Sequence, residues 1–298
     1  MSTKPCPPSV TTLALALTWA AGRLEQATIP DPRLEARLLV AWALDLSPQY
    51  VFGYPEHQVD DTARHNLSLA VDRRARHEPM AHITGEKEFW SLPFRVNTHT
   101  LIPRPDSETL IDAVLAAWPD QARGGRLLDL GTGSGCLMLA LLNERPGWTG
   151  VGVDRSAAAL DVAAGNAQAL GLADRCVFVD CDWDENPLRD LGLGEFDLVI
   201  SNPPYIPLSD RQSLQSDVVD YEPHGALFAG DDGLDAYNAL VPQVAGVLKP
   251  GGDIFLEVGI DQSNRVEQIL AEHGYGRIGH RRDVSGIPRC VFAGIEKQ

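Results

Sequence analysis

The sequence predicts an α/β fold, a parallel sheet with helices, preceded by a small helical bundle. Two observations support this prediction. From about residue 106 onwards, short apolar runs typical of buried parallel strands alternate with helical patterns. Before residue 85, apolar residues recur at helical spacing and turn signals separate them. A chain of 298 residues with 44% hydrophobic content can form a sizeable core in each of two domains.

The helical bundle is predicted over residues 1–84, with its clearest helices at Arg33 to Leu44 and Asp61 to Arg76. Val10 to Ala21 is apolar enough to suggest the core of a signal peptide. However, apolar residues continue at helical spacing past the supposed cleavage site: Leu13, Leu17, Ala20 and Leu24. We therefore favour an amphipathic helix capped near Ser9 or Thr11. No apolar run reaches membrane-spanning length, so we expect a soluble protein without a membrane partner.

Residues 85–105 alternate apolar and polar residues around Asn97 and contain three prolines, which predicts a β-hairpin linker. Residues 106–298 then form the second domain. Arg104 could reach toward a site in that domain, or it could form a salt bridge with Asp106 or Glu108.

A glycine loop follows the first predicted strand of this domain, Arg126 to Leu130. The loop reads Gly131-Thr132-Gly133-Ser134-Gly135, and an apolar helix begins after it at Cys136. Glycines let a ligand approach the backbone closely. The spacing matches neither the dinucleotide fingerprint nor the P-loop. Asp129 beside the loop would repel a pyrophosphate, but it suits a cationic or zwitterionic ligand.

The next two strands also end in candidate ligand-binding residues. Thr149 to Val153 ends at Asp154, where an acid commonly binds ribose hydroxyls, although it could equally cap the following helix. Val177 to Val179 is followed by Asp182 and Trp183. These two residues could flank an adenine ring, while Trp183 considered alone is more typical of a core residue.

The strand Phe196 to Ile200 ends in Asn202-Pro203-Pro204-Tyr205. Asn202 can both accept and donate hydrogen bonds, so it suits another planar amide or amine. The two prolines make the turn rigid and extended, with free carbonyls. Tyr205 offers a flat face for packing. Ligands bind at this edge of open α/β sheets, and we expect the long loop from Pro207 to Asp235 to form a substrate wall.

The chain then continues with three further predicted elements. Gly251 to Val258 and Val291 to Gly294 are strands, and Gln262 to His273 is a helix.

In this order on successive strands, the motifs resemble those of Rossmann-like methyltransferases that use S-adenosylmethionine. The resemblance implies a class I methyltransferase domain with a mostly parallel seven-stranded sheet and helices on both faces. It also implies that the cofactor is S-adenosyl-L-methionine. The cofactor-binding residues would be Asp129, Gly131, Thr132, Gly133, Ser134, Gly135, Asp154, Asp182, Trp183 and Asn202.

Further segments narrow the resemblance. The first two segments are Ile83 to Phe94 and Leu101 to Glu108, and the second of them contains the pattern Pro-Arg-Pro-Asp-x-Glu. The third segment is Arg282 to Gly286, near the end of the chain. Together with the motifs above, these segments closely resemble the protein glutamine methyltransferases known as PrmC or HemK. The resemblance implies methylation of the side-chain amide nitrogen (N5) of the glutamine in the Gly-Gly-Gln motif of class 1 peptide chain release factors. The helical bundle would dock this partner.

The residues also indicate how the reaction could proceed. No lysine, histidine or cysteine stands beside Asn202 in the sequence, so we expect positioning rather than deprotonation of the substrate amide. Asn202 and the Pro203 carbonyl would accept the two amide hydrogens, and Tyr205 would pack against the glutamine or its glycines. The predicted catalytic residues are therefore Asn202, Pro203 and Tyr205, and Pro204 joins them in substrate binding.

Composition bears on the alternatives. Acidic residues outnumber basic ones by 41 to 25, which gives a net charge of −16. This weighs against direct nucleic-acid binding, and so against an adenine or guanine amino-methyltransferase, the main rival, which carries a similar Asn/Asp-Pro-Pro-Tyr/Phe motif. The cluster Arg73 to His77 is either a local basic patch or a solvated helix face. A further alternative is a cofactor-binding scaffold that has lost catalysis. Such a protein would show a damaged glycine loop or Asn-Pro-Pro-Tyr motif, and both are intact here.

Cysteine and histidine usage adds two expectations. The five cysteines form no C-x-x-C pair and the eight histidines lack metal-ligand spacing. We therefore expect reduced thiols, a cytoplasmic location and no metal.

Overall fold

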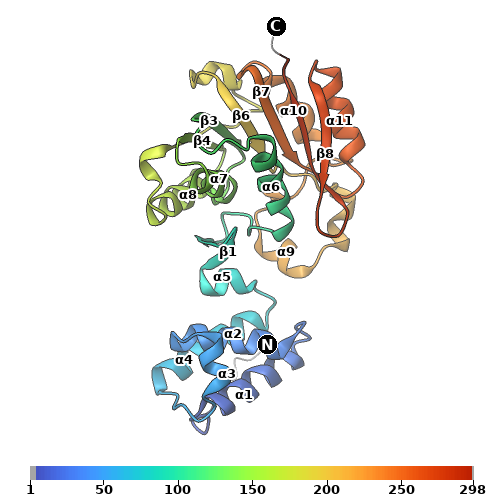
Figure 1. The fold of residues 1–298 in the computed structure, drawn as a ribbon. Coiled ribbons are helices and arrows are strands. Elements are labelled where there is room, and N and C mark those ends of the chain that lie inside the picture. The colour runs from blue at the N-terminus through green and yellow to red at the C-terminus, as the bar shows by residue number, and fades with distance from the viewer. Residues whose placement is uncertain (1–4, 297–298) are drawn as a thin grey trace. The chain divides into compact units, whose positions relative to one another are not determined.

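The computed structural model describes residues 5–296, which separate into two compact units (Figure 1). The first unit holds the described residues through Gly85 together with Gln215–Tyr221, and the second holds the remaining described residues. The hairpin segment therefore groups with the second unit. The domain limits near residues 84 and 105 stay predictions.

The first unit is helical. Its helices are α1 (Leu13–Gln26), α2 (Pro32–Leu44), α3 (Pro48–Gly53), α4 (Asp61–Arg74), α5 (Met80–Thr84) and α9 (Ser216–Tyr221). Helix α1 is capped by Thr12, whose side chain accepts a hydrogen bond from the Leu15 amide. The predicted cap at Ser9 or Thr11 was therefore slightly too early. The buried stripe of α1 packs into the core of this unit and consists of Leu13, Ala16, Ala20 and Leu24.

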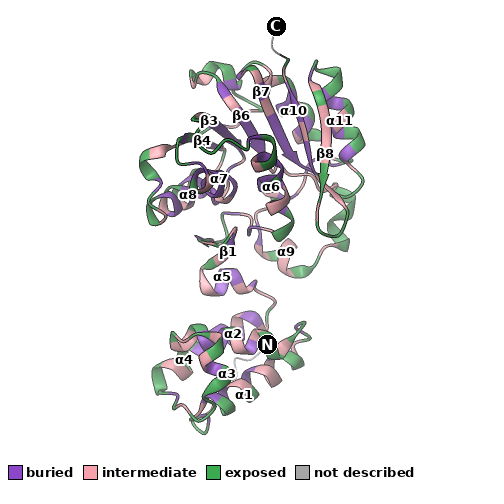
Figure 2. Ribbon diagram, in the orientation of Figure 1, coloured by how far each residue is buried: buried purple, intermediate pink, exposed green. Residues whose placement is uncertain are grey.

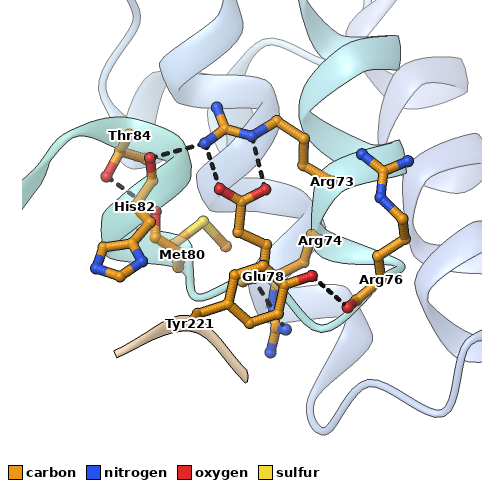
Figure 3. Close-up of polar contacts among 8 residues, drawn as sticks. All are labelled: Arg73, Arg74, Arg76, Glu78, Met80, His82, Thr84 and Tyr221. Carbon is orange, nitrogen blue, oxygen red and sulfur yellow. Dashed lines mark hydrogen bonds and ion pairs between the residues drawn. The ribbon is translucent and has the colours of Figure 1, made fainter. Parts of the chain in front are cut away.

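The basic cluster on α4 is mostly paired inside this unit. Figure 3 shows the Arg73 guanidinium against the Glu78 carboxylate, and this hydrogen bond lowers the pKa of Glu78. Arg74 is buried and pairs with Glu35. The Tyr221 hydroxyl of α9 donates to the Arg76 carbonyl at 2.8 Å. The solvated-face interpretation is therefore wrong for Arg74, and the cluster offers a partner less positive charge than its sequence suggests.

The second unit is built on a seven-stranded sheet in the order β5-β4-β3-β6-β7-β9-β8. Strands β3 to β7 run parallel to one another, and β9 is antiparallel to both β7 and β8. The predicted mostly parallel seven-stranded sheet is confirmed. The strands are β3 (Gly125–Leu130), β4 (Trp148–Asp154), β5 (Cys176–Asp180), β6 (Phe196–Ser201), β7 (Leu248–Glu257), β8 (Gly276–Arg282) and β9 (Pro288–Gly294).

Helices cover both faces of this sheet. Leu127 belongs to a core shared with α6 (Glu108–Ala117), α7 (Cys136–Glu144) and α8 (Ala157–Ala169). Its neighbour Leu128 belongs to the other core, which contains residues of α10 (Asp235–Val244) and α11 (Ser263–Glu272). Successive residues of a strand point to opposite faces, so a continuous apolar strand supplies both cores. Figure 2 shows the resulting buried strands in purple.

Shorter elements complete this unit. Strands β1 (Glu86–Phe89) and β2 (Leu92–Arg95) pair as an antiparallel hairpin. The segment expected as one long loop after Pro207 contains short helices at Leu208–Ser213 and His224–Ala226 in addition to α9. None of the helices among residues 5–296 is long and apolar enough to cross a membrane.

Candidate active site

A cavity of about 470 Å³ opens beside the carboxyl ends of β3, β4 and β6. This volume is in the usual range for small-molecule sites. The cavity is lined by most of the residues that the sequence singled out: Gly131, Thr132, Gly133, Ser134, Asp154, Asp182, Trp183, Asn202 and Pro204. The remaining predicted residues, Asp129, Gly135, Pro203 and Tyr205, are not part of its lining.

The glycine loop wraps the end of β3 in a conformation that favours glycine. Gly131, Gly133 and Gly135 have φ values of 72°, 55° and 79°, all in the left-handed region. The amides of Gly131 and Thr132 both donate to the Val153 carbonyl, at 2.8 and 3.0 Å, and so tie the loop to β4. The loop therefore presents backbone to the cavity from a fixed position.

Asp129 lies behind this loop and is only 1% exposed. Its Oδ2 accepts a hydrogen bond from the Thr132 hydroxyl at 2.7 Å, while its Oδ1 has no hydrogen-bond partner within residues 5–296. Burial raises the pKa of Asp129 to about 7 and the negative charge of Asp154 adds to the rise, while hydrogen bonding to the Thr132 hydroxyl and to the Met138 backbone opposes it. A buried carboxylate with one oxygen left over is favoured by a nearby positive charge.

Asp154 braces the loop from β4. Its Oδ2 accepts from the Gly133 amide at 2.9 Å, and its Oδ1 accepts from the Ser156 amide at 3.0 Å. The N-cap of α8 is Ser156, whose hydroxyl accepts from the Ala159 amide. The helix-cap alternative for Asp154 is therefore wrong. Each carboxylate oxygen can accept a second hydrogen bond, so Asp154 can still bind ligand hydroxyls.

Asp182 and Trp183 form another wall of the cavity. A Cβ atom added to Gly131 would lie 3.5 Å from the Trp183 indole, so the ring lies against the glycine loop. Trp183 also packs on the core of the α10 face, so it is at once a core residue and a wall of the cavity. Asp182 forms an ion pair with Arg155 at 3.8 Å, and Arg155 also lines the cavity.

The Asn-Pro-Pro-Tyr turn (Asn202–Tyr205) bounds the cavity beside β6. Asn202 is half-buried, and its Nδ2 donates to the Ser107 hydroxyl at 3.4 Å. Tyr205 turns toward the protein, because its hydroxyl donates to Oε1 of the buried Glu257 at 3.2 Å. Gln262 donates to the Tyr205 carbonyl at 2.9 Å. The turn is thus held from beneath at both ends.

Two other segments also line the cavity. The sequence had pointed only to Arg104 in the first of them, and to the second as part of the loop from Pro207 to Asp235 that was expected to form a substrate wall. The segment before the second unit's first helix contributes Thr98, His99, Thr100, Leu101, Pro103, Arg104 and Ser107. Arg104 pairs with the buried Glu222 rather than with Asp106 or Glu108. The segment after the Asn-Pro-Pro-Tyr turn contributes Pro223, Gly225, Ala226, Phe228, Ala229 and Gly230.

Sequence reasoning also passed over Glu257, which lies beneath the turn. The sequence does contain a sign of Glu257, because it is the one charged residue in the apolar run Ile254 to Val258. Residues 5–296 contain no group of three or more His, Cys, Asp or Glu side chains arranged to hold a metal ion.

Two family models match the chain. A model described as the PrmC N-terminal domain matches residues 16–85, and one described as a methyltransferase domain matches residues 121–273.

Curated relatives align over almost the whole length. The release factor glutamine methyltransferase of Bradyrhizobium diazoefficiens is 41% identical over 276 residues, covering 92% of this chain and 91% of the relative. The protein of the same name from Caulobacter vibrioides is 40% identical and covers 94% and 96%. Among solved structures, a methyltransferase from Pyrococcus furiosus superposes with a TM-score of 0.51 at 16% identity, covering 76% of this chain and 98% of that one. This last match concerns the fold alone.

Proposed function

The chain belongs to the release factor glutamine methyltransferase family, and we propose that it methylates the N5 amide nitrogen of the glutamine in the Gly-Gly-Gln motif of class 1 release factors. The methyl donor is S-adenosylmethionine. The observation that carries the proposal is that the glycine loop, Asp154 and Asn202 all border one cavity. The proposed donor site and the proposed amide-holding group thereby border the same cavity.

The residues around the glycine loop suit this donor. When bound, S-adenosylmethionine supplies a methyl group on a positively charged sulfur. The unpartnered Oδ1 of Asp129 favours a cationic ligand nearby. Asp154 has acceptor capacity for ribose hydroxyls, and the loop's left-handed glycines leave room for close approach. Trp183 offers an aromatic face for the adenine, with Asp182 beside it.

Asn202 and Pro203 position the substrate amide. An amide nitrogen is a poor nucleophile, because its lone pair is delocalised into the carbonyl. If the Asn202 side-chain oxygen and the Pro203 carbonyl accept its two hydrogens, the nitrogen is oriented and its developing positive charge is stabilised.

No strong base is required for this scheme, because the methylated nitrogen, which carries the positive charge lost by the sulfur, is a strong acid and releases its extra proton to water. Cys136 lines the same cavity, but burial raises the pKa of its thiol to about 12, which makes it a poor base at neutral pH. The hydrogen bond that Tyr205 makes to Glu257 points its hydroxyl away from the substrate. We therefore assign Tyr205 to holding the turn, with only the accessible part of its ring left to contact the glutamine or its glycines.

The helical unit is the proposed docking site for the release factor. Leu34, Leu38 and Trp42 stand four residues apart on α2 and are 50%, 37% and 42% exposed, so they form one apolar stripe on that helix. An apolar stripe left open to solvent is typical of a protein-binding surface. A release-factor substrate would place the reaction in the cytoplasm.

The decisive experiment is radiolabelled methyl transfer. The full chain is incubated with labelled S-adenosylmethionine and a purified class 1 release factor, or with a variant in which the glutamine of Gly-Gly-Gln is replaced by alanine. We expect label on the first protein only, at the amide nitrogen. Equal labelling of the variant, or transfer to DNA or RNA with a salt-sensitive complex, would overturn the proposal.

A further inference from the structure

A buried polar network supports the Asn-Pro-Pro-Tyr turn from below. Glu257 ends β7 and is 2% exposed, and Ser107 is 3% exposed. Oε1 of Glu257 accepts from the Tyr205 hydroxyl, and its Oε2 has no hydrogen-bond partner within residues 5–296. The Ser107 hydroxyl lies close enough to Glu257 to lower its pKa as a hydrogen-bond donor does, and its oxygen accepts from the Asn202 Nδ2 at 3.4 Å. Ser107 therefore connects a buried carboxylate to the residue that borders the cavity.

The chemistry of these groups gives the network a direction. An ionised carboxylate can only accept hydrogen bonds, and a serine hydroxyl has a single hydrogen to donate. If that hydrogen goes to Glu257, the Ser107 oxygen can only accept from Asn202. The NH2 of Asn202 must then face Ser107, and its carbonyl oxygen must face the cavity.

We propose that Glu257, acting through the Ser107 hydroxyl, fixes Asn202 in the one orientation that presents its side-chain oxygen to the substrate amide. This inference rests on the proposed function, because only an amide substrate needs an acceptor at that point. Glu257 and Ser107 are positioning residues. Neither has to touch the reacting nitrogen.

The opposite arrangement shows why the carboxylate matters. A protonated Glu257 could donate to Ser107, which would free the serine hydrogen to bond the Asn202 oxygen. The amide would then turn by about 180° and present its NH2 group to the cavity. Two donors would face each other, the substrate NH2 and the Asn202 NH2, and the substrate would lose its acceptor.

Glu257 is placed to titrate near neutral pH. Burial raises the pKa of Glu257 to about 7, and the negative charge of Asp106 adds to this rise. Hydrogen bonding to Ser107 and Tyr205 and the positive charge of Arg289 lower the pKa but do not offset the effect of burial. The other titratable groups that interact with it are Tyr237 of α10, Cys290 of β9 and Cys136 of α7. Because the ionised form is the orienting one, turnover should fall as the pH drops through this range.

Four variants of the full chain test the proposal. Ser107→Ala removes the relay, and Ser107→Thr keeps the hydroxyl. Glu257→Gln keeps the shape of the side chain but can donate, so it no longer fixes the direction. Tyr237→Phe is the matched control, because the Tyr237 hydroxyl donates to the backbone carbonyl of Glu257 at 2.7 Å and not to its carboxylate.

Methyl transfer to a release factor is measured across the pH range at saturating substrates, alongside the melting temperature and the Kd for S-adenosylhomocysteine. Ser107→Ala and Glu257→Gln should each lower kcat by roughly tenfold, the kinetic equivalent of one hydrogen bond, with little change in this Kd. Ser107→Thr should restore most of the turnover, and the acidic limb of the pH profile should disappear in Glu257→Gln. Tyr237→Phe should lower the melting temperature while keeping kcat and the profile.

Three results would overturn the inference while leaving the proposed function intact. One is a kcat near that of the unmodified chain in both Ser107→Ala and Glu257→Gln. A second is an acidic limb that survives in Glu257→Gln, which would assign it to another group such as Asp129. The third is a Ser107→Thr variant that folds and binds S-adenosylhomocysteine yet remains as slow as Ser107→Ala. Absence of transfer by the unmodified chain would instead refute the proposed function.

Discussion

Replacing Asn202 by alanine is the sharpest test of the proposed chemistry. The change removes the side-chain oxygen that would accept a substrate N–H in the cavity. Loss of one preorganised polar group at a reacting centre typically lowers kcat by about 10²–10³, or about 2.7–4 kcal/mol. The folded state should lose far less. Asn202 is half-buried and makes one long hydrogen bond, to Ser107, whose net contribution to stability is about 1 kcal/mol.

The assay separates these effects. Single-turnover methyl transfer to a release factor reports the chemical step, and titration with S-adenosylhomocysteine reports the donor site. Asn202→Ala should lose turnover while its Kd changes little. Asn202→Asp is the control of matched shape. It keeps an acceptor, but it cannot donate to Ser107 and it brings a second carboxylate toward Glu257, so it should also be slow. Near-normal turnover by a folded Asn202→Ala variant would refute the reasoning.

Three further predictions concern the donor half of the cavity. Asp154→Ala should weaken S-adenosylhomocysteine binding by about 1–3 kcal/mol, the cost of losing a charged acceptor. Calorimetry measures this change. An unchanged Kd would mean that Asp154 does not bind the donor and only holds the Gly133 and Ser156 amides. Trp183→Ala should weaken the same binding by about 1–3 kcal/mol, the usual range for base stacking, while Trp183→Phe should retain most of it; equal losses would remove stacking as the cause. Asp129 has a pKa of about 7 in the folded protein, above its ordinary value of 3.8. Between these two values the folded state keeps a proton that the unfolded chain releases, so the stability of the fold decreases as the pH rises from one to the other. Asp129→Asn should therefore raise the melting temperature more at about pH 8 than at about pH 5 while weakening donor binding, and a stabilisation independent of pH would contradict this sign.

The sequence predicted well what is encoded in short segments. The apolar run before Gly131 and the run before Asn202 are buried strands that lie side by side as β3 and β6. Each is followed at once by its motif, so the carboxyl edge of the parallel sheet brings the two motifs to one cavity. The spacing of residues within each segment was sufficient to predict this site, because a parallel sheet places the residues that follow neighbouring strands at the same edge.

Contacts between distant segments were not predictable in this way. Arg104 has two acids close by in the sequence, yet it pairs with Glu222, which comes from the segment after the Asn-Pro-Pro-Tyr turn. Arg74 is buried against Glu35 of another helix, although the run of basic residues suggested a solvated surface. Ion-pair partners depend on which distant segments the fold brings together. The periodicity of apolar residues along the sequence does not predict these contacts.

Among the regular elements that were missed, α10 and β8 have sequences that carry contrary signals. Helix α10 contains Pro242 in its interior, a residue that usually ends or kinks a helix. Its buried residues Tyr237, Leu240, Val241 and Val244 fix it against the sheet, so packing overrides the local preference. Strand β8 is mostly only half-buried or exposed and lies at the sheet edge, so it lacks the apolar run that identified the other strands.

Two buried acids of the second unit lie where they can serve its function at a cost in stability. Asp129 and Glu257 are buried acids whose pKa values are both raised to about 7 by burial. A rise from the ordinary 4.5 to about 7 at Glu257 corresponds to about 3 kcal/mol at 1.36 kcal/mol per unit, so ionising it in the fold is costly. A stable core would place neutral side chains at both positions. Each instead lies directly behind a motif, Asp129 behind the glycine loop and Glu257 beneath Asn202. Local inconsistency of this kind is expected where function outweighs stability, and here it separates two tasks. In the proposed scheme, Asp129 supplies negative charge for a cationic donor, and Glu257 supplies a direction to the hydrogen bonds that hold the acceptor amide.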